Sequence, residues 1–245
     1  MTETSYLSSV RASYDAVAVD YARLVSAELA GKPLDRAMLA AFAEYVRDDA
    51  GGGGRAVADL GCGPGRVTAH LDGLGVRAFG VDLSPAMVAV ARRTYPGLRF
   101  EVGSMAALDV ADGVLGGVLA WYSTVHTPPS ELPSLFAEFA RVLAPGGHLL
   151  IAFEAGGTGV APDGAGGRSR LDRAYGHPVD LEVYRTPPGL IADLLTGAGL
   201  TEVARLVREP AADESTQQGF LLARKAAEPA GRAEPAGRAE PAGTR

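Results

Sequence analysis

Two hydrophobic patterns alternate along the middle of the chain. Short apolar runs are separated by segments in which apolar residues recur every three or four positions. The first pattern is typical of buried parallel strands and the second of amphipathic helices. Strands are expected at 56–60, 76–82, 98–102, 116–121 and 148–153, with helices at 66–74, 85–94 and 132–143. This alternation predicts a parallel sheet covered by helices on both faces.

The N-terminal part reads as two helices without strands. Apolar residues at three- or four-residue steps predict a helix over 10–30, which Gly31 ends, and Pro33 begins a second helix. A run of four glycines at 51–54 follows and reads as a flexible hinge. Residues 1–54 are therefore predicted to form an N-terminal helical segment and its hinge, with 1–10 disordered.

The C-terminal part changes the pattern again. A strand at 181–185 and a helix at 187–197 precede two strands at 200–207 and 219–224, whose connection is too short for a crossover helix. These last strands should form an antiparallel hairpin. The fold class is then α/β, a Rossmann-like, seven-stranded, mostly parallel sheet, with the main domain over 55–225.

Two segments lie outside this pattern. Residues 155–178 are rich in Gly, Pro, Asp and Arg and read as a surface excursion, and 155–186 is the expected cover of a ligand site. Residues 226–245 repeat Ala-Glu-Pro-Ala-Gly-Arg, which cannot bury apolar surface, so a disordered tail is predicted.

Composition narrows the class of protein. Hydrophobic residues make up 47% of the 245 residues, which is enough for a sizeable core, and no apolar stretch reaches the roughly 18 residues of a membrane helix. The single cysteine, Cys62, excludes an intrachain disulfide and disfavours a cysteine-based zinc site. The net charge is −6, without a clustered basic face. We expect a cytoplasmic protein with no metal, no membrane and no nucleic-acid partner.

A glycine-rich loop carries the first candidate chemistry. The sequence VADLGCGPG begins at Val57, and Asp59 is followed by Gly61, Gly63 and Gly65 at alternate positions. Glycines let a ligand approach the backbone closely, and the following helix offers free N–H groups. Asp82 closes the second strand, where a carboxylate can accept hydrogen bonds from ribose hydroxyls. The pattern indicates a nucleotide-type ligand.

Other readings of this loop remain. The dinucleotide fingerprint G-x-G-x-x-G would need a third glycine at position 66, which is Arg66, and no phosphate-binding Gly-Lys-Ser/Thr is present. A nicotinamide oxidoreductase is thereby disfavoured. A glycine-rich turn with no ligand is the bland alternative.

Three segments carry a family resemblance: VADLGCGPGRVTAHL, GVDLSPAMVAVAR and FAEFARVLAPGGHLLIAF. They resemble motifs of class I S-adenosylmethionine-dependent methyltransferases, above all the small-molecule group that includes ubiquinone and menaquinone methyltransferases, over roughly 10–225. The resemblance implies S-adenosylmethionine as cofactor and S-adenosylhomocysteine as product. It implies that the loop lies beside the methionine part, that Asp82 holds the ribose and that Leu83 packs on adenine. The implied loop contacts are Asp59, Gly61, Gly63 and Gly65.

The other expected cofactor contacts depart further from the family pattern. Where the family often has an Asp after the third strand, this chain has Ser104, which can still bond the adenine edge, and Met105, which can pack on the ring. The phrase YDAVAVDYARL resembles a lid segment in which Tyr14 and Tyr21 share a helical face. Their alternative role is ordinary core packing. We expect Tyr14 near the cofactor and Tyr21 near the acceptor.

The end of the fourth strand should bring the transfer chemistry. WYSTVHTPP begins at Trp121, a further cofactor contact, and contains Tyr122 and His126. Imidazole titrates near neutral pH, so His126 is the candidate general base. Its alternative role is to orient the acceptor. Tyr122, Tyr175 and Tyr184 are the expected acceptor contacts.

These residues favour one function over two others. Methyl transfer to a small, aromatic or apolar, natural-product-like acceptor is expected, by in-line displacement and in a monomer or homodimer. Whether oxygen, nitrogen or carbon is methylated stays open. A protein or RNA methyltransferase of the same fold and a non-catalytic cofactor-binding protein are the alternatives.

Overall fold

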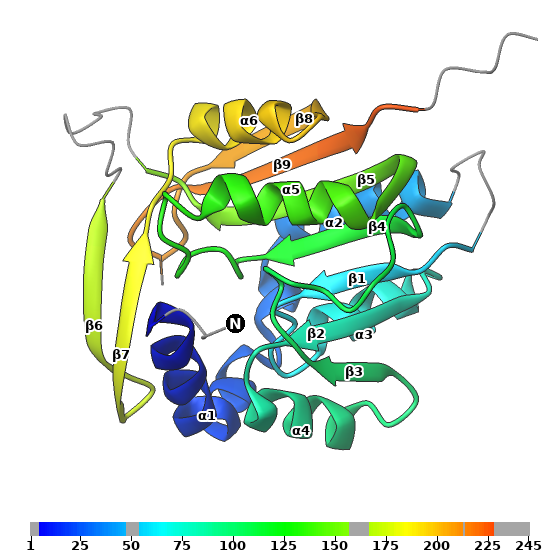
Figure 1. Cartoon of the computed structure of the whole chain (residues 1–245). Helices are drawn as coiled ribbons and strands as arrows, with labels where there is room; N and C mark the ends of the chain where they lie inside the picture. Colours follow the sequence, from blue (N-terminus) through cyan, green and yellow to red (C-terminus); the bar gives the residue numbers. More distant parts are fainter. Residues whose placement is uncertain (1–4, 48–53, 157–166, 213, 228–245) are drawn as a thin grey trace, which may run out of the picture.

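A seven-stranded sheet forms the centre of the molecule (Figure 1). The computed structural model describes residues 5–47, 54–156, 167–212 and 214–227. The sheet order is β3-β2-β1-β4-β5-β9-β8, in which the first five strands are parallel and β9 runs antiparallel to both of its neighbours. The strands are β1 Val57–Leu60, β2 Ala78–Asp82, β3 Arg99–Val102, β4 Leu115–Trp121, β5 Leu143–Glu154, β8 Leu200–Arg208 and β9 Gln218–Lys225. The predicted fold class, including the C-terminal antiparallel hairpin, is confirmed.

Helices cover both faces of this sheet. The helices are α1 Ser5–Val25, α2 Pro33–Arg47, α3 Arg66–Gly73, α4 Pro85–Thr94, α5 Leu132–Val142 and α6 Pro188–Gly197, with a short 3-10 helix, η1, at Glu28–Gly31. Phe136 and Phe139 of α5 are fully buried in one core cluster, and Phe42 of α2 and Leu71 of α3 are fully buried in another. The core is therefore split by the sheet, as the helix–strand alternation predicts.

The two N-terminal helices lie in different places on the sheet. The apolar stripe of α2 is buried against the sheet, so closely that a Cβ added at Gly117 of β4 would lie 2.9 Å from Phe42. In contrast, α1 lies across the end of the sheet at which β1, β2 and β4 finish (Figure 1). α1 begins at Ser5, so the expectation of disorder over 1–10 was wrong for residues 5–10.

A second, two-stranded sheet stands beside α1. It pairs β6, Arg168–Ala174, with β7, His177–Tyr184, in antiparallel register. The strand expected at 181–185 is thus part of β7 but lies outside the main sheet. β6 lies within the segment 155–178, for which the sequence predicts a surface excursion and no individual strand, because its exposed, arginine-rich sequence lacks the apolar signal of a strand. Its stability comes from pairing with β7 rather than from burial.

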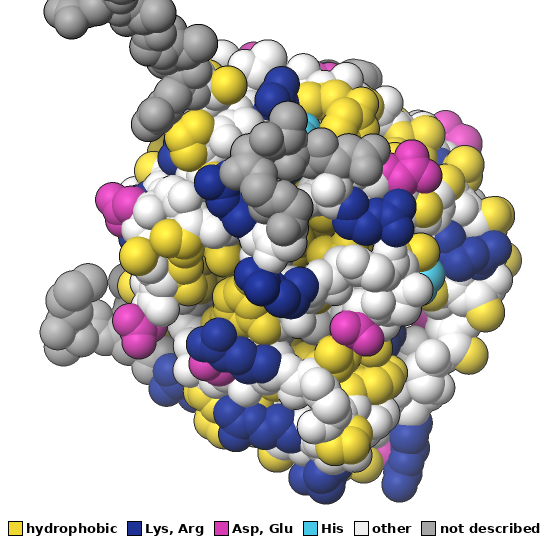
Figure 2. All heavy atoms as spheres, turned by 90° about the vertical axis from the view of Figure 1, so that its right-hand side faces the viewer, with side chains coloured by type: hydrophobic (Ala, Val, Ile, Leu, Met, Phe, Trp, Pro, Cys, Tyr) yellow, Lys and Arg dark blue, Asp and Glu magenta, His cyan; other side chains and the backbone are white. Residues whose placement is uncertain are grey.

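Several predicted features lie outside the described residues. These are most of the four-glycine hinge, residues 157–166 of the excursion, and the tail from 228 onward. Within the described ranges, no helix combines the length and apolar character needed to span a membrane. On the face of the molecule away from α1, basic side chains are interspersed with hydrophobic and acidic ones (Figure 2).

Candidate active site

The glycine loop and the end of β2 are joined through Asp82. Its Oδ2 accepts a hydrogen bond from the Gly63 backbone N–H at 2.8 Å, and its Oδ1 accepts one from the Ser84 N–H at 2.8 Å. Gly61 has a φ of +70°, and a Cβ there would lie 2.3 Å from the Ser123 Cβ. The loop therefore requires glycine at position 61, and it presents Asp82 with an unused lone pair on each oxygen.

Two predicted contacts support this loop from beneath. Asp59 is buried and its Oδ2 accepts a hydrogen bond from the Thr68 hydroxyl at 2.6 Å. Burial raises the pKa of Asp59 to about 6, with the Thr68 bond acting in the opposite direction. A Cβ at Gly65 would lie 2.7 Å from the ring of Phe100, so this glycine allows close packing at the start of α3. Neither residue lines the cavity described next.

One cavity of about 890 Å³ opens at the carboxyl ends of β1, β2 and β4, under α1 and beside β7. Such a volume is within the range of small-molecule and cofactor sites. Most of the predicted contacts line it, namely Tyr14, Tyr21, Gly61, Gly63, Asp82, Leu83, Ser104, Met105, Trp121, Tyr122, His126 and Tyr175. Tyr184 does not, since its side chain is turned to the carboxylate of Glu182, to which its hydroxyl donates. The fold thus gathers residues that are up to 161 positions apart, from Tyr14 to Tyr175.

One side of the cavity, here called the cofactor wall, comes from the strand ends. It consists of Gly61, Gly63, Asp82, Leu83, Ser104 and Met105. The hydroxyl of Ser104 accepts a hydrogen bond from the Ala106 N–H at 3.2 Å and so helps to shape its own turn. This wall is made largely of backbone and short side chains.

The opposite side, the acceptor wall, is assembled from three separate segments. Leu7, Val10 and Tyr14 come from α1, Val125, His126 and Thr127 from the loop after β4, and Leu181 and Val183 from β7. The backbone N–H of Tyr184 donates to the Val125 carbonyl at 2.8 Å, which fixes β7 against that loop. Side chains, mostly apolar, make up this wall.

His126 is the polar centre of the acceptor wall. Its Nδ1 lies 2.6 Å from the carbonyl oxygen of Glu182, and its Nε2 lies 2.8 Å from the Tyr14 hydroxyl. A carbonyl only accepts, so Nδ1 carries the proton, and Nε2 then accepts from Tyr14. Burial lowers the pKa of His126, which keeps the imidazole neutral.

Aromatic rings continue from Tyr14 across the cavity. The Tyr14 and Tyr21 rings meet edge to face at 6.1 Å, and those of Tyr21 and Tyr175 at 5.2 Å. Tyr122 has a φ of +55°, unusual for a residue with a side chain. Its hydroxyl and that of Ser123 are buried without a hydrogen-bond partner among the described residues.

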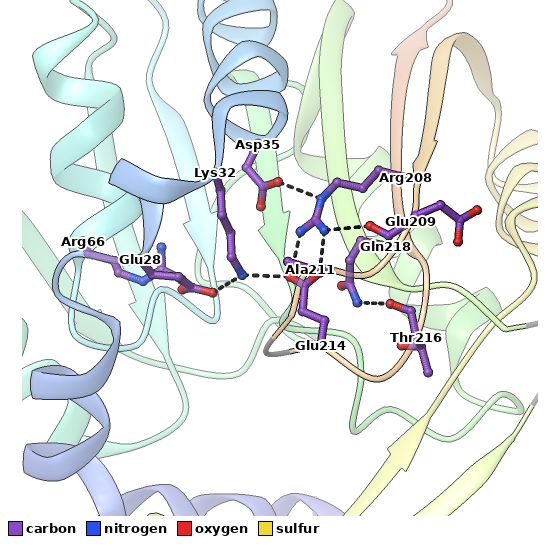
Figure 3. A network of polar contacts seen from close by, with 10 residues as sticks. All are labelled: Glu28, Lys32, Asp35, Arg66, Arg208, Glu209, Ala211, Glu214, Thr216 and Gln218. Carbon is purple, nitrogen blue, oxygen red and sulfur yellow. Dashed lines mark hydrogen bonds and ion pairs between the residues drawn. The ribbon is translucent and has the colours of Figure 1, made fainter.

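A chain of ion pairs, the ionic rim, borders the cavity near the start of α2 (Figure 3). It runs through Arg66, Glu28, Lys32, Glu214 and Arg208, with Lys32 2.7 Å from Glu28 and 2.9 Å from Glu214. Hydrogen bonds from Arg208 are the largest reason that the pKa of Glu214 falls to about 2. The sequence contains no signal for this rim, because its members come from three distant segments and share no motif.

Comparisons with known proteins find similarity to methyltransferases over the central part of the chain. Residues 57–147 match the family model described as "Methyltransferase domain". The chain is 30% identical over 149 residues to a demethylmenaquinone methyltransferase of Chlorobaculum parvum, covering 60% of each protein. It is 38% identical over 100 residues to a trans-aconitate 2-methyltransferase of Methylobacterium nodulans, covering 39% of this chain and 36% of the relative.

A solved structure agrees with the fold over nearly the whole length. The magnesium protoporphyrin IX methyltransferase of Synechocystis PCC 6803, solved with bound S-adenosylmethionine, superposes with a TM-score of 0.65 at 16% identity. The match covers 92% of this chain and all of that one. The matched segments of the two curated relatives remain 60% or less of those proteins' own lengths. The resemblance to class I S-adenosylmethionine-dependent methyltransferases, predicted from three sequence segments, is confirmed.

Proposed function

We propose that this chain, similar in its central domain to small-molecule S-adenosylmethionine-dependent methyltransferases, transfers a methyl group to a small, uncharged, aromatic or apolar acceptor. One observation carries the proposal. A single cavity places Asp82 and the glycine loop on one wall and a neutral, hydrogen-bonded imidazole on the other. The cofactor and the acceptor would meet between the two walls.

The cofactor wall fits S-adenosylmethionine. Asp82 retains acceptor capacity for ribose hydroxyls, and nothing lies within 3.8 Å of the position that a Cβ at Gly63 would occupy. Leu83, Met105 and Ser104 would border the adenine, while Trp121 and the free hydroxyl of Tyr122 lie farther along the cavity. When bound, S-adenosylmethionine supplies an activated methyl group and a sulfur leaving group.

The acceptor wall limits the chemistry of the second substrate. The α1, β7 and 125–127 residues that line it include no lysine or arginine. A carboxylate acceptor would lose its hydration there without gaining a cationic partner, which is costly. The lining cations, Lys32 and Arg66, belong to the ionic rim and are paired with acids. An uncharged acceptor with an aromatic or aliphatic body fits best.

In this proposal the chain positions the acceptor and removes its proton. Holding the acceptor in line with the methyl group lowers the entropic part of the barrier. His126 is the proposed base for an O–H or N–H acceptor, and its neutral state suits that task. We further propose a cytoplasmic monomer or homodimer acting on a natural-product-like compound, without a metal ion.

Calorimetry and turnover test the proposal together. S-adenosylhomocysteine should bind the purified full-length chain with a stoichiometry of one. Radiolabelled S-adenosylmethionine should then label at least one member of a panel of phenols, anilines and hydroxyquinones. Absence of cofactor binding by the folded chain would refute the assignment; binding without any labelled product would favour the non-catalytic alternative.

A further inference from the structure

Both ring nitrogens of His126 already have hydrogen-bond partners. Its Nδ1 is engaged by the Glu182 carbonyl at 2.6 Å and its Nε2 by the Tyr14 hydroxyl at 2.8 Å. With 9% of its surface exposed, it has no nitrogen lone pair open to the cavity. The Tyr14 hydroxyl donates to Nε2 and retains lone pairs of its own. Direct proton transfer from acceptor to His126 would require that this bond be broken first.

We infer that the Tyr14 hydroxyl is the group that takes the acceptor's proton, and that His126 acts through it. The inference rests on the proposed methyl-transfer function and assigns the contact with the acceptor to α1 rather than to the loop after β4. Tyr14 would be the catalytic residue in this scheme. His126 would be a positioning residue that also receives the proton from Tyr14.

The proton and electron changes balance. The acceptor oxygen forms a bond to the methyl carbon while the carbon–sulfur bond breaks and its electron pair stays on sulfur. The acceptor O–H proton moves to the Tyr14 oxygen, and the Tyr14 proton moves to His126 Nε2. Tyr14 ends as a neutral phenol and His126 as an imidazolium, which later releases its proton to solvent.

The surroundings favour coupled movement of the two protons. Burial and the negative groups Asp82 and Glu154 raise the pKa of Tyr14 well above its ordinary value of 10.0, so a free tyrosinate is disfavoured. The Tyr21 and Tyr175 hydroxyls act in the same direction. The Glu182 carbonyl, by accepting from Nδ1, favours the imidazolium and raises the His126 pKa against the effect of burial. Tyr14 can therefore pass a proton without holding a charge.

A double-mutant cycle separates this relay from direct catalysis by His126. Tyr14→Phe and His126→Ala should each lower kcat at least tenfold on a phenol acceptor, and the double variant should lose no more than the worse single variant. If His126 touches the acceptor itself, Tyr14→Phe frees Nε2 and preserves or raises kcat. That result would overturn the inference. Tyr45→Phe, on exposed α2 surface outside the cavity, is the matched control.

A series of phenols of graded acidity gives a second readout. The loss caused by Tyr14→Phe should be largest for the least acidic phenol and disappear for one that is already ionised at the assay pH. A loss of equal size along the series would mean that Tyr14 only shapes the site. If wild type methylates amines or thiols but no phenol, methyl transfer stands and the relay is overturned.

A third measurement needs no acceptor, so the failure of the inference and of the proposed function can be told apart. In ¹⁵N-histidine NMR spectra of the full chain with S-adenosylhomocysteine, His126 should appear as the neutral Nδ1–H tautomer. Tyr14→Phe should shift its Nε2 resonance, whereas Tyr45→Phe should not. A proton on Nε2, or no shift in the Tyr14→Phe spectrum, would remove the basis for the relay even if turnover is observed.

Discussion

The cofactor wall and the acceptor wall face each other across one cavity but are built in opposite ways. In the first, Gly61, Gly63 and Asp82 lie within 22 residues of sequence and use backbone N–H groups and positive φ angles. In the second, Tyr14 and His126 are 112 residues apart and meet only through side chains. The contrast suggests that the first wall is fixed by local geometry and the second by docking of α1 and β7.

This difference has an energetic consequence. A change in the cofactor wall must be absorbed by a loop that has three positive-φ glycines and is hydrogen-bonded to the end of β2, so it should affect both stability and cofactor affinity. A change in the acceptor wall alters one side-chain contact among several, so it should leave the glycine loop intact. Substitutions in the cofactor wall test this distinction.

The largest effect is expected from Gly61→Ala. A Cβ would lie 2.3 Å from the Ser123 Cβ, at a φ that favours glycine. The clash and the backbone strain together should lower the free energy of unfolding by about 2–5 kcal/mol. Denaturant unfolding followed by tryptophan fluorescence would measure the loss, and cofactor affinity should fall with it.

Gly63→Ala is the matched control for that variant. Its φ of +54° is also positive, but the nearest atom to an added Cβ is 3.8 Å away, on the Tyr21 ring. Only the cost of placing alanine at a positive φ should remain, so the free energy of unfolding should fall by about 1–2 kcal/mol. Equal destabilisation by the two substitutions would show that contact with Ser123 does not shape the loop.

Asp59→Asn should change how stability depends on pH. The raised pKa, about 6 against an ordinary 3.8, means that burial disfavours the ionised carboxylate in the folded state. The contribution of the Asp59 carboxyl to wild-type stability is fully present below about pH 3.8 and is lost as the pH rises through about 6. Asparagine does not ionise, so the stability of the Asp59→Asn variant relative to wild type should improve by roughly 3 kcal/mol as the pH rises between these two values. Unfolding curves at pH 4 and pH 7 measure the difference; parallel curves would contradict it.

Asp82→Ala comes next in size and separates binding from folding. Loss of hydrogen bonds to a carboxylate should weaken S-adenosylmethionine binding by about 1.5–3 kcal/mol, or roughly tenfold to 150-fold. Calorimetry with S-adenosylhomocysteine is the measurement, accompanied by circular dichroism to confirm an intact fold. His126→Ala is its partner across the cavity and should change that affinity by no more than about twofold. An equal loss in both variants would abolish the distinction between the walls.

The sequence predicts the sheet, and the proximity of the glycine loop to Asp82, for a physical reason. Strand periodicity and the loop-to-Asp82 spacing are local signals, and residues 56–154 contain most of them. Asp59 and Gly65 lie beneath the loop and do not line the cavity. The motif alone could not show this, because a residue that contacts the ligand and a residue that supports the loop occupy equivalent places in it. Local signals also could not pair β6 with β7 or assemble the ionic rim, since both depend on how distant segments dock.

The bond between Tyr14 and His126 illustrates the same limit in the acceptor wall. Each residue was predicted for the site, Tyr14 beside the cofactor and His126 as the base. The sequence contains no signal that α1 would bring the hydroxyl within 2.8 Å of Nε2. That contact depends on β7, whose Glu182 carbonyl fixes the imidazole tautomer.

The smallest expected effect belongs to Ser104 and tests how far the cofactor wall depends on backbone. Its hydroxyl accepts from the Ala106 N–H at 3.2 Å and keeps its O–H donor and one lone pair, so it can offer adenine one neutral hydrogen bond. Ser104→Ala should therefore weaken S-adenosylhomocysteine binding by only about 0.5–1 kcal/mol, roughly twofold to fivefold, the value of one neutral hydrogen bond. Ser104→Asp introduces the carboxylate that related enzymes often have there, and it should restore or exceed wild-type affinity because an ionised acceptor forms stronger bonds to adenine N–H donors. Calorimetry on both variants decides the matter. A loss of more than tenfold in Ser104→Ala would show that this wall depends on a side chain as strongly as the acceptor wall does.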